Sequence, residues 1–357
     1  MKNEFSDITV IIPSYKPDGK LTDTLRGILA AGFDDIIVVD DGGGEEYAPF
    51  FSEAGKLGCT VLHHEVNQGK GAALKTAFAF FAENRSEFAG AVTADADGQH
   101  LPEDIAAVAR EMRETGKVVI GSRDFSDPKV PPRSRFGNKC TSLMFRLFIG
   151  MKLSDTQTGL RAIPGKYIPD IAEAKGSRYE YETQMLFLMK QRSIPYLEKT
   201  ISTVYIEDNS SSHFRPVRDS LRIYSMILMF VLSSLSSALA DHLFYYICLR
   251  LIGGAAISEA YAHIASIVIA RVLSSLLNYT LNAKTVFNSK TGKRTMLRYI
   301  VLAVSQITVS AVLIWLIKTA LGITSPELQT VIKMIVDTLL FFFSFRIQCV
   351  WVFREGK

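Results

Sequence analysis

The stretch Phe88-Ala89-Gly90-Ala91-Val92-Thr93-Ala94-Asp95-Ala96-Asp97-Gly98-Gln99-His100 joins a short apolar run to two carboxylates one residue apart. The apolar run predicts a buried strand, so Asp95 and Asp97 lie where that strand ends. Such a pair can be a surface turn, but it can also share a hard divalent cation that holds a diphosphate, and Gln99 adds a neutral oxygen ligand. We therefore predict a site for Mg²⁺ or Mn²⁺ formed by Asp95, Asp97 and Gln99.

Strand-like and helix-like segments alternate on both sides of this stretch. Short apolar or β-branched runs predict strands at residues 8–12, 36–39, 60–64 and 117–120. Apolar residues recur at helical spacing over 21–29 and 72–81, and a further helix is expected from Pro102. This alternation predicts an α/β fold with a mostly parallel central sheet covered on both faces, which places ligands at the carboxyl ends of its strands.

Other polar motifs also follow predicted strands. Pro13 and Tyr15 follow the first strand, where they could form the floor under a nucleotide base or a simple strand-to-helix turn. Asp40 and Asp41 follow the second, where a carboxylate can accept the imino N–H of uracil or guanine, although Asp and Gly also suit a tight turn. Lys70 opens a helix without the spacing of a phosphate-binding loop, so a P-loop ATPase is excluded, and an ion pair and a diphosphate contact both remain open.

Basic residues follow the fifth predicted strand. Arg123 and Arg135 could be solvated charges or salt bridges, but they could also bind a lipid phosphate bidentately. Next to them, apolar residues between Cys140 and Met151 recur at helical spacing among lysines and arginines. This stripe could pack on the sheet or lie among lipid headgroups.

The second part of the chain has a different composition. Residues 1–223 carry 28 Lys and Arg against 31 Asp and Glu, a net charge of −3, whereas residues 224–357 carry 12 against 5, a net charge of +7. Four apolar segments, at about 224–252, 261–281, 299–321 and 328–352, are long enough to span a bilayer. We therefore predict two domains, 1–223 and 224–357, with a lipid bilayer and not nucleic acid as partner.

The distribution of charge predicts the orientation of these spans. The loop between the second and third spans is basic, and the other two loops contain no Lys or Arg. By the positive-inside rule we expect a multi-pass protein of the cell (inner or plasma) membrane, with the first domain and the C-terminus in the cytoplasm. The acidic start of the chain does not resemble a signal peptide, and the four dispersed cysteines suggest neither zinc nor a disulfide framework.

The membrane part also contains a weak internal repeat. The segment 278–287 (NYTLNAKTVF) aligns with 344–353 (SFRIQCVWVF), and both close an apolar span with polar residues followed by an aromatic end. This match predicts two related two-helix hairpins, with chance similarity as the alternative.

Taken together, the motifs of the first domain resemble glycosyltransferase family 2, and its polyprenyl-phosphate sugar synthases in particular. The motifs that carry the resemblance are Val10–Tyr15, Val38–Gly42, Asn67–Ala73, Asp95–His100, Gly121–Arg123 and Asp155–Arg161. The remaining chain is similar to a GtrA-like membrane domain through Ala270, Arg271, Asn278, Tyr279, Asn282 and the end Val352–Arg354.

The resemblance implies a GT-A domain followed by four transmembrane helices. It implies that Asp97 is the main metal ligand, aided by Asp95 and Gln99, and that Arg123 and Arg135 bind an acceptor phosphate. In such enzymes the positions of Pro13, Tyr15, Asp40 and Lys70 line the nucleotide pocket. The Gly42-Gly43-Gly44 sequence departs from the usual Asp-Gly-Ser continuation, which leaves the donor sugar undetermined.

The expected reaction is inverting transfer of one sugar from a nucleotide-diphosphate sugar to a polyprenyl (undecaprenyl or dolichyl) phosphate, for cell-envelope glycan or glycoconjugate synthesis. Asp155, Gly159 and Arg161 are expected near the sugar, with Glu180 and Glu182 as further candidates or members of an ion-pair network. Two alternatives remain: a processive polysaccharide synthase, although its Gln-x-x-Arg-Trp motif is not found, and a lipid-linked-sugar translocator or plain anchor in the membrane half. A homo-oligomer is left open.

Overall fold

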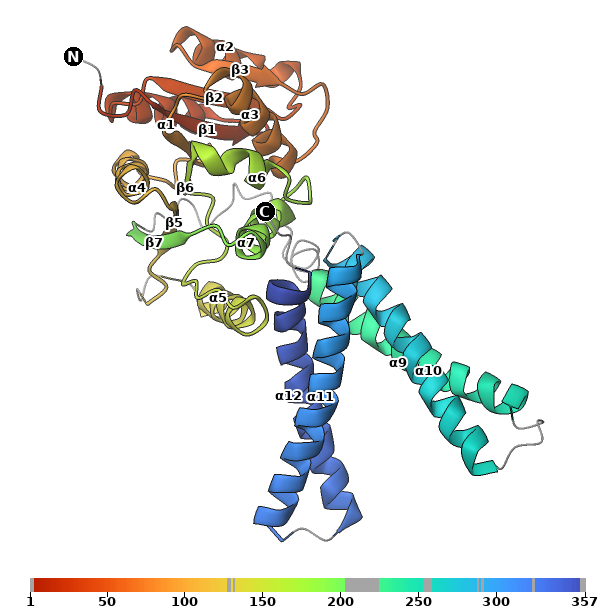
Figure 1. Cartoon of the computed structure of the whole chain (residues 1–357). Coiled ribbons are helices and arrows are strands. Elements are labelled where there is room, and N and C mark those ends of the chain that lie inside the picture. Colours follow the sequence, from red (N-terminus) through yellow and green to blue (C-terminus); the bar gives the residue numbers. More distant parts are fainter. Residues whose placement is uncertain are drawn as a thin grey trace. The chain divides into compact units, whose positions relative to one another are not determined.

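The computed structural model describes residues 3–126, 130, 132–202, 225–252, 259–287, 289, 292–322 and 325–353 (Figure 1). The chain forms two compact units, an α/β unit and a helical unit. The predicted domain boundary between residues 223 and 224 lies outside the described residues.

The α/β unit is built on one seven-stranded sheet with the order β3-β2-β1-β4-β6-β5-β7. The sheet is parallel except for β6, which runs antiparallel to both β4 and β5. The predicted mostly parallel sheet is therefore confirmed, whereas β6 and β7 were not predicted. The strands are β1 (Ile8–Ser14), β2 (Asp35–Asp40), β3 (Thr60–His63), β4 (Gly90–Thr93), β5 (Val118–Arg123), β6 (Arg161–Pro164) and β7 (Tyr196–Ile201).

Helices cover both faces of the sheet. One face packs on α1, α2 and α4, and a hydrophobic core cluster lies there, around Val10, Leu25 and Val108. The other face packs on α3, with α6 and α7 against that helix. The helices of this unit are α1 (Gly19–Ala30), α2 (Ala48–Lys56), α3 (Lys70–Asn84), α4 (Pro102–Thr115), α5 (Pro132–Met144), α6 (Ile168–Ala172) and α7 (Glu180–Gln191), with the short helical turns η1 (Glu45–Tyr47), η2 (Phe145–Ile149) and η3 (Gly165–Tyr167).

Strand register brings the polar motifs to one edge. Ser14 of β1 lies opposite Asp40 of β2, and Ile11 of β1 lies opposite Thr93 of β4. Because β6 is antiparallel to both β4 and β5, those two strands point the same way, so Arg123 ends its strand at the edge where Asp95 follows β4. The ends of β1, β2, β4 and β5 therefore face the same side of the unit.

The helix α5 is amphipathic, with two faces of different character. Asn138, Thr141 and Phe145 of α5 and η2 are buried. Phe136 and Leu143, two turns apart, are 71% and 54% exposed. Of the predicted apolar stripe, Leu143 is exposed and Met151 is buried, and the exposed apolar side chains of α5 suit a lipid surface.

The helical unit contains four long helices at the positions predicted for the spans. They are α9 (Ser225–Ile252), α10 (Glu259–Leu281), α11 (Lys293–Ala320) and α12 (Pro326–Ile347), and the π-helical turns η5 (Asn282–Val286) and η6 (Gln348–Val352) follow α10 and α12. Within the described residues, three stretches are long and apolar enough to cross a membrane: Leu228–Ile252, Lys293–Ala320 and Val331–Val352. The helix α10 is not among them, so the count of four spans stays a prediction.

The contacts within the helical unit support the predicted internal repeat. Asn282 of η5 and Gln348 of η6, equivalent positions of the aligned segments, are joined by a hydrogen bond of 3.0 Å from Asn282 Nδ2 to Gln348 Oε1. Each also contacts the residue four positions earlier: Asn282 donates to Asn278 and Gln348 donates to Ser344.

Aromatic residues at aligned positions of the two segments also contact each other. Phe287 and Phe353, which end the two aligned segments, stack with ring centroids 4.9 Å apart. Phe287 also packs on Phe345 at 5.6 Å, and Phe353 packs on Tyr279 at 5.8 Å. If each residue is replaced by the one at the aligned position, the contact of Phe287 with Phe345 becomes the contact of Phe353 with Tyr279. The two hairpins are therefore related by a local pseudo-two-fold axis.

Candidate active site

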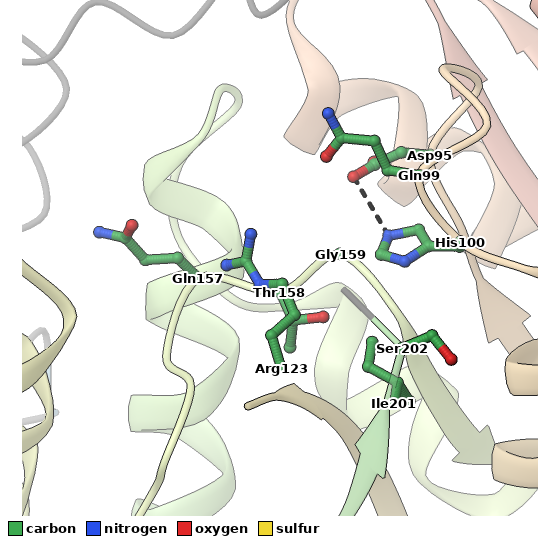
Figure 2. Close-up of a pocket in the computed structure, with 9 residues that line it drawn as sticks. All are labelled: Asp95, Gln99, His100, Arg123, Gln157, Thr158, Gly159, Ile201 and Ser202. Carbon is green, nitrogen blue, oxygen red and sulfur yellow. Dashed lines mark ion pairs between the residues drawn. The ribbon is translucent and has the colours of Figure 1, made fainter. Parts of the chain in front are cut away.

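One pocket lies at the carboxyl edge of the sheet (Figure 2). Three of the predicted site residues, Asp95, Gln99 and Arg123, line it together. They come from the segment after β4 and from the end of β5, which the antiparallel β6 separates in the sheet. Gly159, which was expected near the sugar, also lines the pocket, and the other lining residues are His100, Gln157, Thr158, Ile201 and Ser202.

The carboxylate of Asp95 is held from three sides. Lys70 Nζ lies 2.6 Å from its Oδ1. His100 Nε2 lies 3.4 Å from its Oδ2, and a dashed line marks this ion pair in Figure 2. Gly159 approaches so closely that an added Cβ would lie 2.6 Å from Oδ2. Burial alone would raise the pKa of Asp95, but the charges of Lys70 and His100 outweigh burial and lower that pKa, so the carboxyl is ionised.

Asp97 is held by its own turn. Its Oδ1 accepts a hydrogen bond of 3.0 Å from the backbone N–H of Gln99, which fixes the three predicted ligands in one tight loop. Burial and then the charge of Asp95 raise the pKa of Asp97. A divalent cation would relieve the repulsion between the two carboxylates that helps to raise the pKa of Asp97, and their hard oxygens, with the amide oxygen of Gln99, suit Mg²⁺ or Mn²⁺.

These protein ligands do not form a complete coordination sphere. In the described part of the chain, no group of three or more His, Cys, Asp or Glu side chains is arranged to hold a metal ion. A cation at Asp95 and Asp97 would therefore take its remaining ligands from Gln99, water or the phosphate oxygens of a bound ligand, as Mg²⁺ commonly does.

Lys70 forms the ion pair that was one of its two predicted roles. Its ammonium bridges Asp95 and Glu182, with Glu182 Oε1 at 2.9 Å. Burial would lower the pKa of Lys70, but the two carboxylates outweigh that effect and raise it, so the cation is retained. An ammonium has three N–H donors, so two carboxylate partners leave one donor for an anionic ligand.

The adjacent aspartates after β2 differ in their surroundings. Asp40 accepts a hydrogen bond from Gly43 N at 3.1 Å and pairs with His63 at 3.1 Å, and its side chain is 14% exposed. Asp41 is buried, and its carboxylate binds the loop that leads to α3. Pro13 and Tyr15 lie half-buried at the end of β1. None of these four residues lines the pocket of Figure 2.

The two predicted phosphate-binding arginines occupy different places. Arg123 lines the pocket, and its guanidinium binds the fully buried Asp155 through Nε at 2.6 Å and through Nη2 at 3.2 Å. Arg135 lies on α5, where it is exposed and donates to the backbone oxygen of Val130 at 3.4 Å. The structure therefore groups Arg123 with the carboxylates and leaves Arg135 outside the pocket.

Some residues of the site could not be identified from sequence alone. The buried ring of His100 lines the pocket and contacts Asp95. Gln157 and Thr158 had no assigned role. Their position in the motif Asp155–Arg161, between two of the candidate residues, was the signal available.

Comparison with known proteins matches both units. Residues 9–168 match the family described as glycosyl transferase family 2, and residues 229–353 match the GtrA/DPMS transmembrane domain. The chain belongs to glycosyltransferase family 2, and it is a glycosyltransferase with a membrane domain.

Three relatives illustrate this similarity. An uncharacterised protein of Methanocaldococcus jannaschii is 31% identical over 210 residues, which cover 57% of this chain and 84% of the relative. The UDP-N-acetylglucosamine–dolichyl-phosphate N-acetylglucosaminyltransferase of Methanococcus voltae is 28% identical over 242 residues, 62% of this chain and 95% of the relative. The undecaprenyl-phosphate mannosyltransferase of Micrococcus luteus is 29% identical over 190 residues, 50% and 76% of the respective chains.

Proposed function

We propose that this enzyme transfers one sugar from a nucleotide-diphosphate sugar to a polyprenyl phosphate, undecaprenyl or dolichyl, with inversion at the anomeric carbon. The observation that carries the proposal is the shared pocket, which is lined by the carboxylate of Asp95, the amide of Gln99 and the guanidinium of Arg123. Two relatives bear names with dolichyl-phosphate and undecaprenyl-phosphate acceptors, which supports the same acceptor class here. The product would serve the synthesis of a cell-envelope glycan or glycoconjugate.

The donor half of the site lies around Asp95 and Asp97. These carboxylates and Gln99 would hold Mg²⁺ or Mn²⁺, which supplies charge neutralisation for the leaving diphosphate. Lys70 keeps one donor for a phosphate oxygen, and the exposed edge of Asp40 is available to the imino N–H of the base. Pro13 and Tyr15, at the adjacent strand end, complete the nucleotide side.

The acceptor half lies around Arg123. Asp155 fixes the guanidinium through two of its nitrogens, so its remaining N–H groups are aimed in a defined direction. The exposed apolar residues Phe136 and Leu143 suit α5 for the headgroup layer, and Arg135 on that helix would meet the lipid phosphate before it reaches Arg123.

The proposed transfer does not require a strong general base from the protein. A phosphate monoester is ionised at neutral pH, so its oxygen can attack the anomeric carbon without a general base. The new bond joins that oxygen to the anomeric carbon, and the bond from this carbon to the diphosphate oxygen breaks. The electron pair leaves on the diphosphate, next to Lys70.

The membrane orientation forms part of the same proposal. The nucleotide sugar would come from the cytoplasm, and the basic residues between the second and third predicted spans favour the cytoplasmic side for the ends of those helices. The α/β unit and the C-terminus would then face the cytoplasm of a cell that carries this protein in its inner or plasma membrane.

A transfer assay with membranes tests the proposal. Membranes containing the protein are incubated with undecaprenyl or dolichyl phosphate and a panel of radiolabelled UDP and GDP sugars. We expect one labelled sugar on an extractable lipid, and none with Asp97→Ala, whose membrane insertion should be unchanged. A long polymer as product, or full transfer by Asp97→Ala, would contradict the proposal.

A translocator role for the membrane half is not favoured by the contacts. Asp241 pairs with Arg271 at 3.3 Å and accepts from Ser274 at 2.7 Å, both on the neighbouring helix. Asp337 accepts from Ser310 on its neighbouring helix at 2.7 Å. Asp241 and Asp337 therefore have partners on neighbouring helices, and Asp337 also pairs with Lys333 on its own helix, so these charges have a structural use within the helical unit.

A further inference from the structure

Asp41 is a buried carboxylate at the end of β2, 2% exposed and next to the more exposed Asp40. Its Oδ1 accepts from His64 Nδ1 at 2.8 Å and from the backbone N–H of Gln68 at 2.9 Å. Its Oδ2 accepts from Asn67 Nδ2 at 2.9 Å and from the backbone N–H of Gly69 at 2.8 Å. All four donors belong to the segment between β3 and α3.

These four hydrogen bonds use the whole acceptor capacity of the side chain. A carboxylate offers about four lone-pair sites, and each oxygen of Asp41 already accepts twice. A base N–H would have to displace one of these donors, which would leave a buried polar group unpaired. Asp41 is therefore unsuited to a direct nucleotide contact.

The loop that Asp41 holds leads directly to Lys70. Gly69 has a φ of +101°, and a Cβ there would lie 2.5 Å from the backbone oxygen of Ser177. On that side Arg178 donates to Asn67 Oδ1 at 3.2 Å. The loop is thus fixed between Asp41 and the segment 177–178, and α3 begins at Lys70 with its position determined.

Lys70 in turn reaches Asp95 and Glu182, at 2.6 and 2.9 Å. We infer that Asp41 is a positioning residue, which acts on the diphosphate only through the loop Asn67–Gly69 and the Lys70 ammonium. The inference rests on the proposed function for its ligand, and it separates the roles of two adjacent aspartates: Asp40 for the base and Asp41 for the phosphates.

Nucleotide binding by the full-length protein tests this inference. Asp41→Asn keeps the size of the side chain but turns an NH₂ group toward two of the four donors. We expect it to weaken the binding of UDP or GDP, whichever the wild type binds more tightly, by about tenfold, the scale of one charge-assisted hydrogen bond. Binding of uridine or guanosine, which carry no phosphate, should change less than about twofold.

Two variants serve as controls for position and charge. Asp40→Asn should weaken the nucleoside and the nucleoside diphosphate alike, because it removes a contact to the base. Asp23→Asn removes one negative charge in the same way, but at an exposed position of α1 outside the loop Asn67–Gly69. This variant should alter neither affinity. Equal loss of both ligands in Asp41→Asn, or no loss of either, would overturn the inference.

A double-mutant cycle tests the route through Lys70. In a Lys70→Ala background, Asp41→Asn should cause no further loss of diphosphate affinity, because the group it positions is gone. Fully additive losses would refute the route.

Amide hydrogen exchange gives a readout that needs no nucleotide. Gln68 and Gly69 should be protected in the wild type and exchange faster in Asp41→Asn, and unchanged exchange would contradict the inference even if no nucleotide binds. If the wild type binds neither UDP nor GDP, the proposed function fails, and exchange still decides the role of Asp41. Asn67→Ala, which removes one donor, replaces Asp41→Asn if the latter does not fold.

Discussion

Gly159 shows how closely backbone and carboxylate approach in this site. A Cβ at this position would lie 2.6 Å from Asp95 Oδ2, shorter than any tolerated contact. The neighbouring backbone is also fixed, because Thr93 Oγ1 donates to the Gly159 carbonyl at 2.7 Å. A side chain at residue 159 would therefore displace Asp95 rather than move away from it.

Gly159→Ala should accordingly lower kcat by at least about tenfold and cost about 1 to 3 kcal/mol in the free energy of unfolding. Transfer assays and thermal unfolding of the purified protein measure the two effects. The matched control is Gly55→Ala in α2, where an added Cβ meets nothing within 4 Å. That control should keep full activity, and an equal loss of activity in both variants would refute the argument.

The opposite pKa shifts of Asp95 and Asp97 predict a pH dependence of metal binding. Burial and the charge of Asp95 raise the pKa of Asp97, so its carboxyl gains a proton at a higher pH than an ordinary aspartate. Only the ionised form binds a cation, so Mn²⁺ affinity should be complete well above that pKa and fall as the pH is lowered through it. Titrations from about pH 8 to about pH 3 measure this, and a midpoint at or below the ordinary value of 3.8 would contradict it.

At the scale of residues, the sequence predicted part of the group that lines the pocket, but not what each residue does. Asp95, Gln99 and Arg123 could be predicted to lie together because each follows a strand, and strands are visible as apolar runs. Asp40 and Asp41 could not be distinguished, since their difference depends on donors from residues 63–69. The contact of Glu182 with Lys70 joins residues far apart in the sequence, so the spacing of motifs does not predict it.

At the scale of elements, the parallel core of the sheet was predictable and its second half was not. The strand β1 is an almost continuous apolar run because it is buried on both faces, as parallel strands are. The strand β6 has only four residues and begins with the fully buried Arg161, so it shows neither alternation nor an apolar run. Yet β6 is the strand that places the end of β5 beside the end of β4.

The polar contact between η5 and η6 predicts the behaviour of two membrane variants. Asn282→Leu should destabilise the helical unit by about 1 to 2 kcal/mol, because it removes the donor to the buried Gln348 Oε1 and the acceptor for the buried Ser233 hydroxyl. Adding Gln348→Leu should cost less than the sum of the two single variants, since both buried partners are then apolar. Unfolding in detergent measures this, and strict additivity would show that the two side chains are not coupled.

At the scale of the whole molecule, the two units have separate interiors. The α/β unit has its own core cluster, drawn entirely from residues before 203. The exposed large apolar side chains are concentrated in α9–α12, as expected for surfaces that face lipid. The apolar composition of residues 224–357 predicts such surfaces for this part of the chain.

A chain ending at Ser225 should therefore still transfer sugar to a detergent-dispersed polyprenyl phosphate, with most of its association with membranes lost. Product formation and sedimentation with vesicles measure the two properties. The full-length chain carrying Asp97→Ala is the matched inactive control. If the shortened chain folds but makes no product, the membrane unit contributes to catalysis and not only to location.

The reciprocal contacts between η5 and η6 bear on the origin of the membrane domain. On a two-fold axis, each residue meets its own counterpart, as Asn282 meets Gln348 and Phe287 meets Phe353. Such an interface can form between two copies of one sequence, so it does not require two different partner sequences. A single ancestral hairpin could thus have assembled as a homodimer in the bilayer, and gene fusion would then have joined two copies that were already adapted to each other.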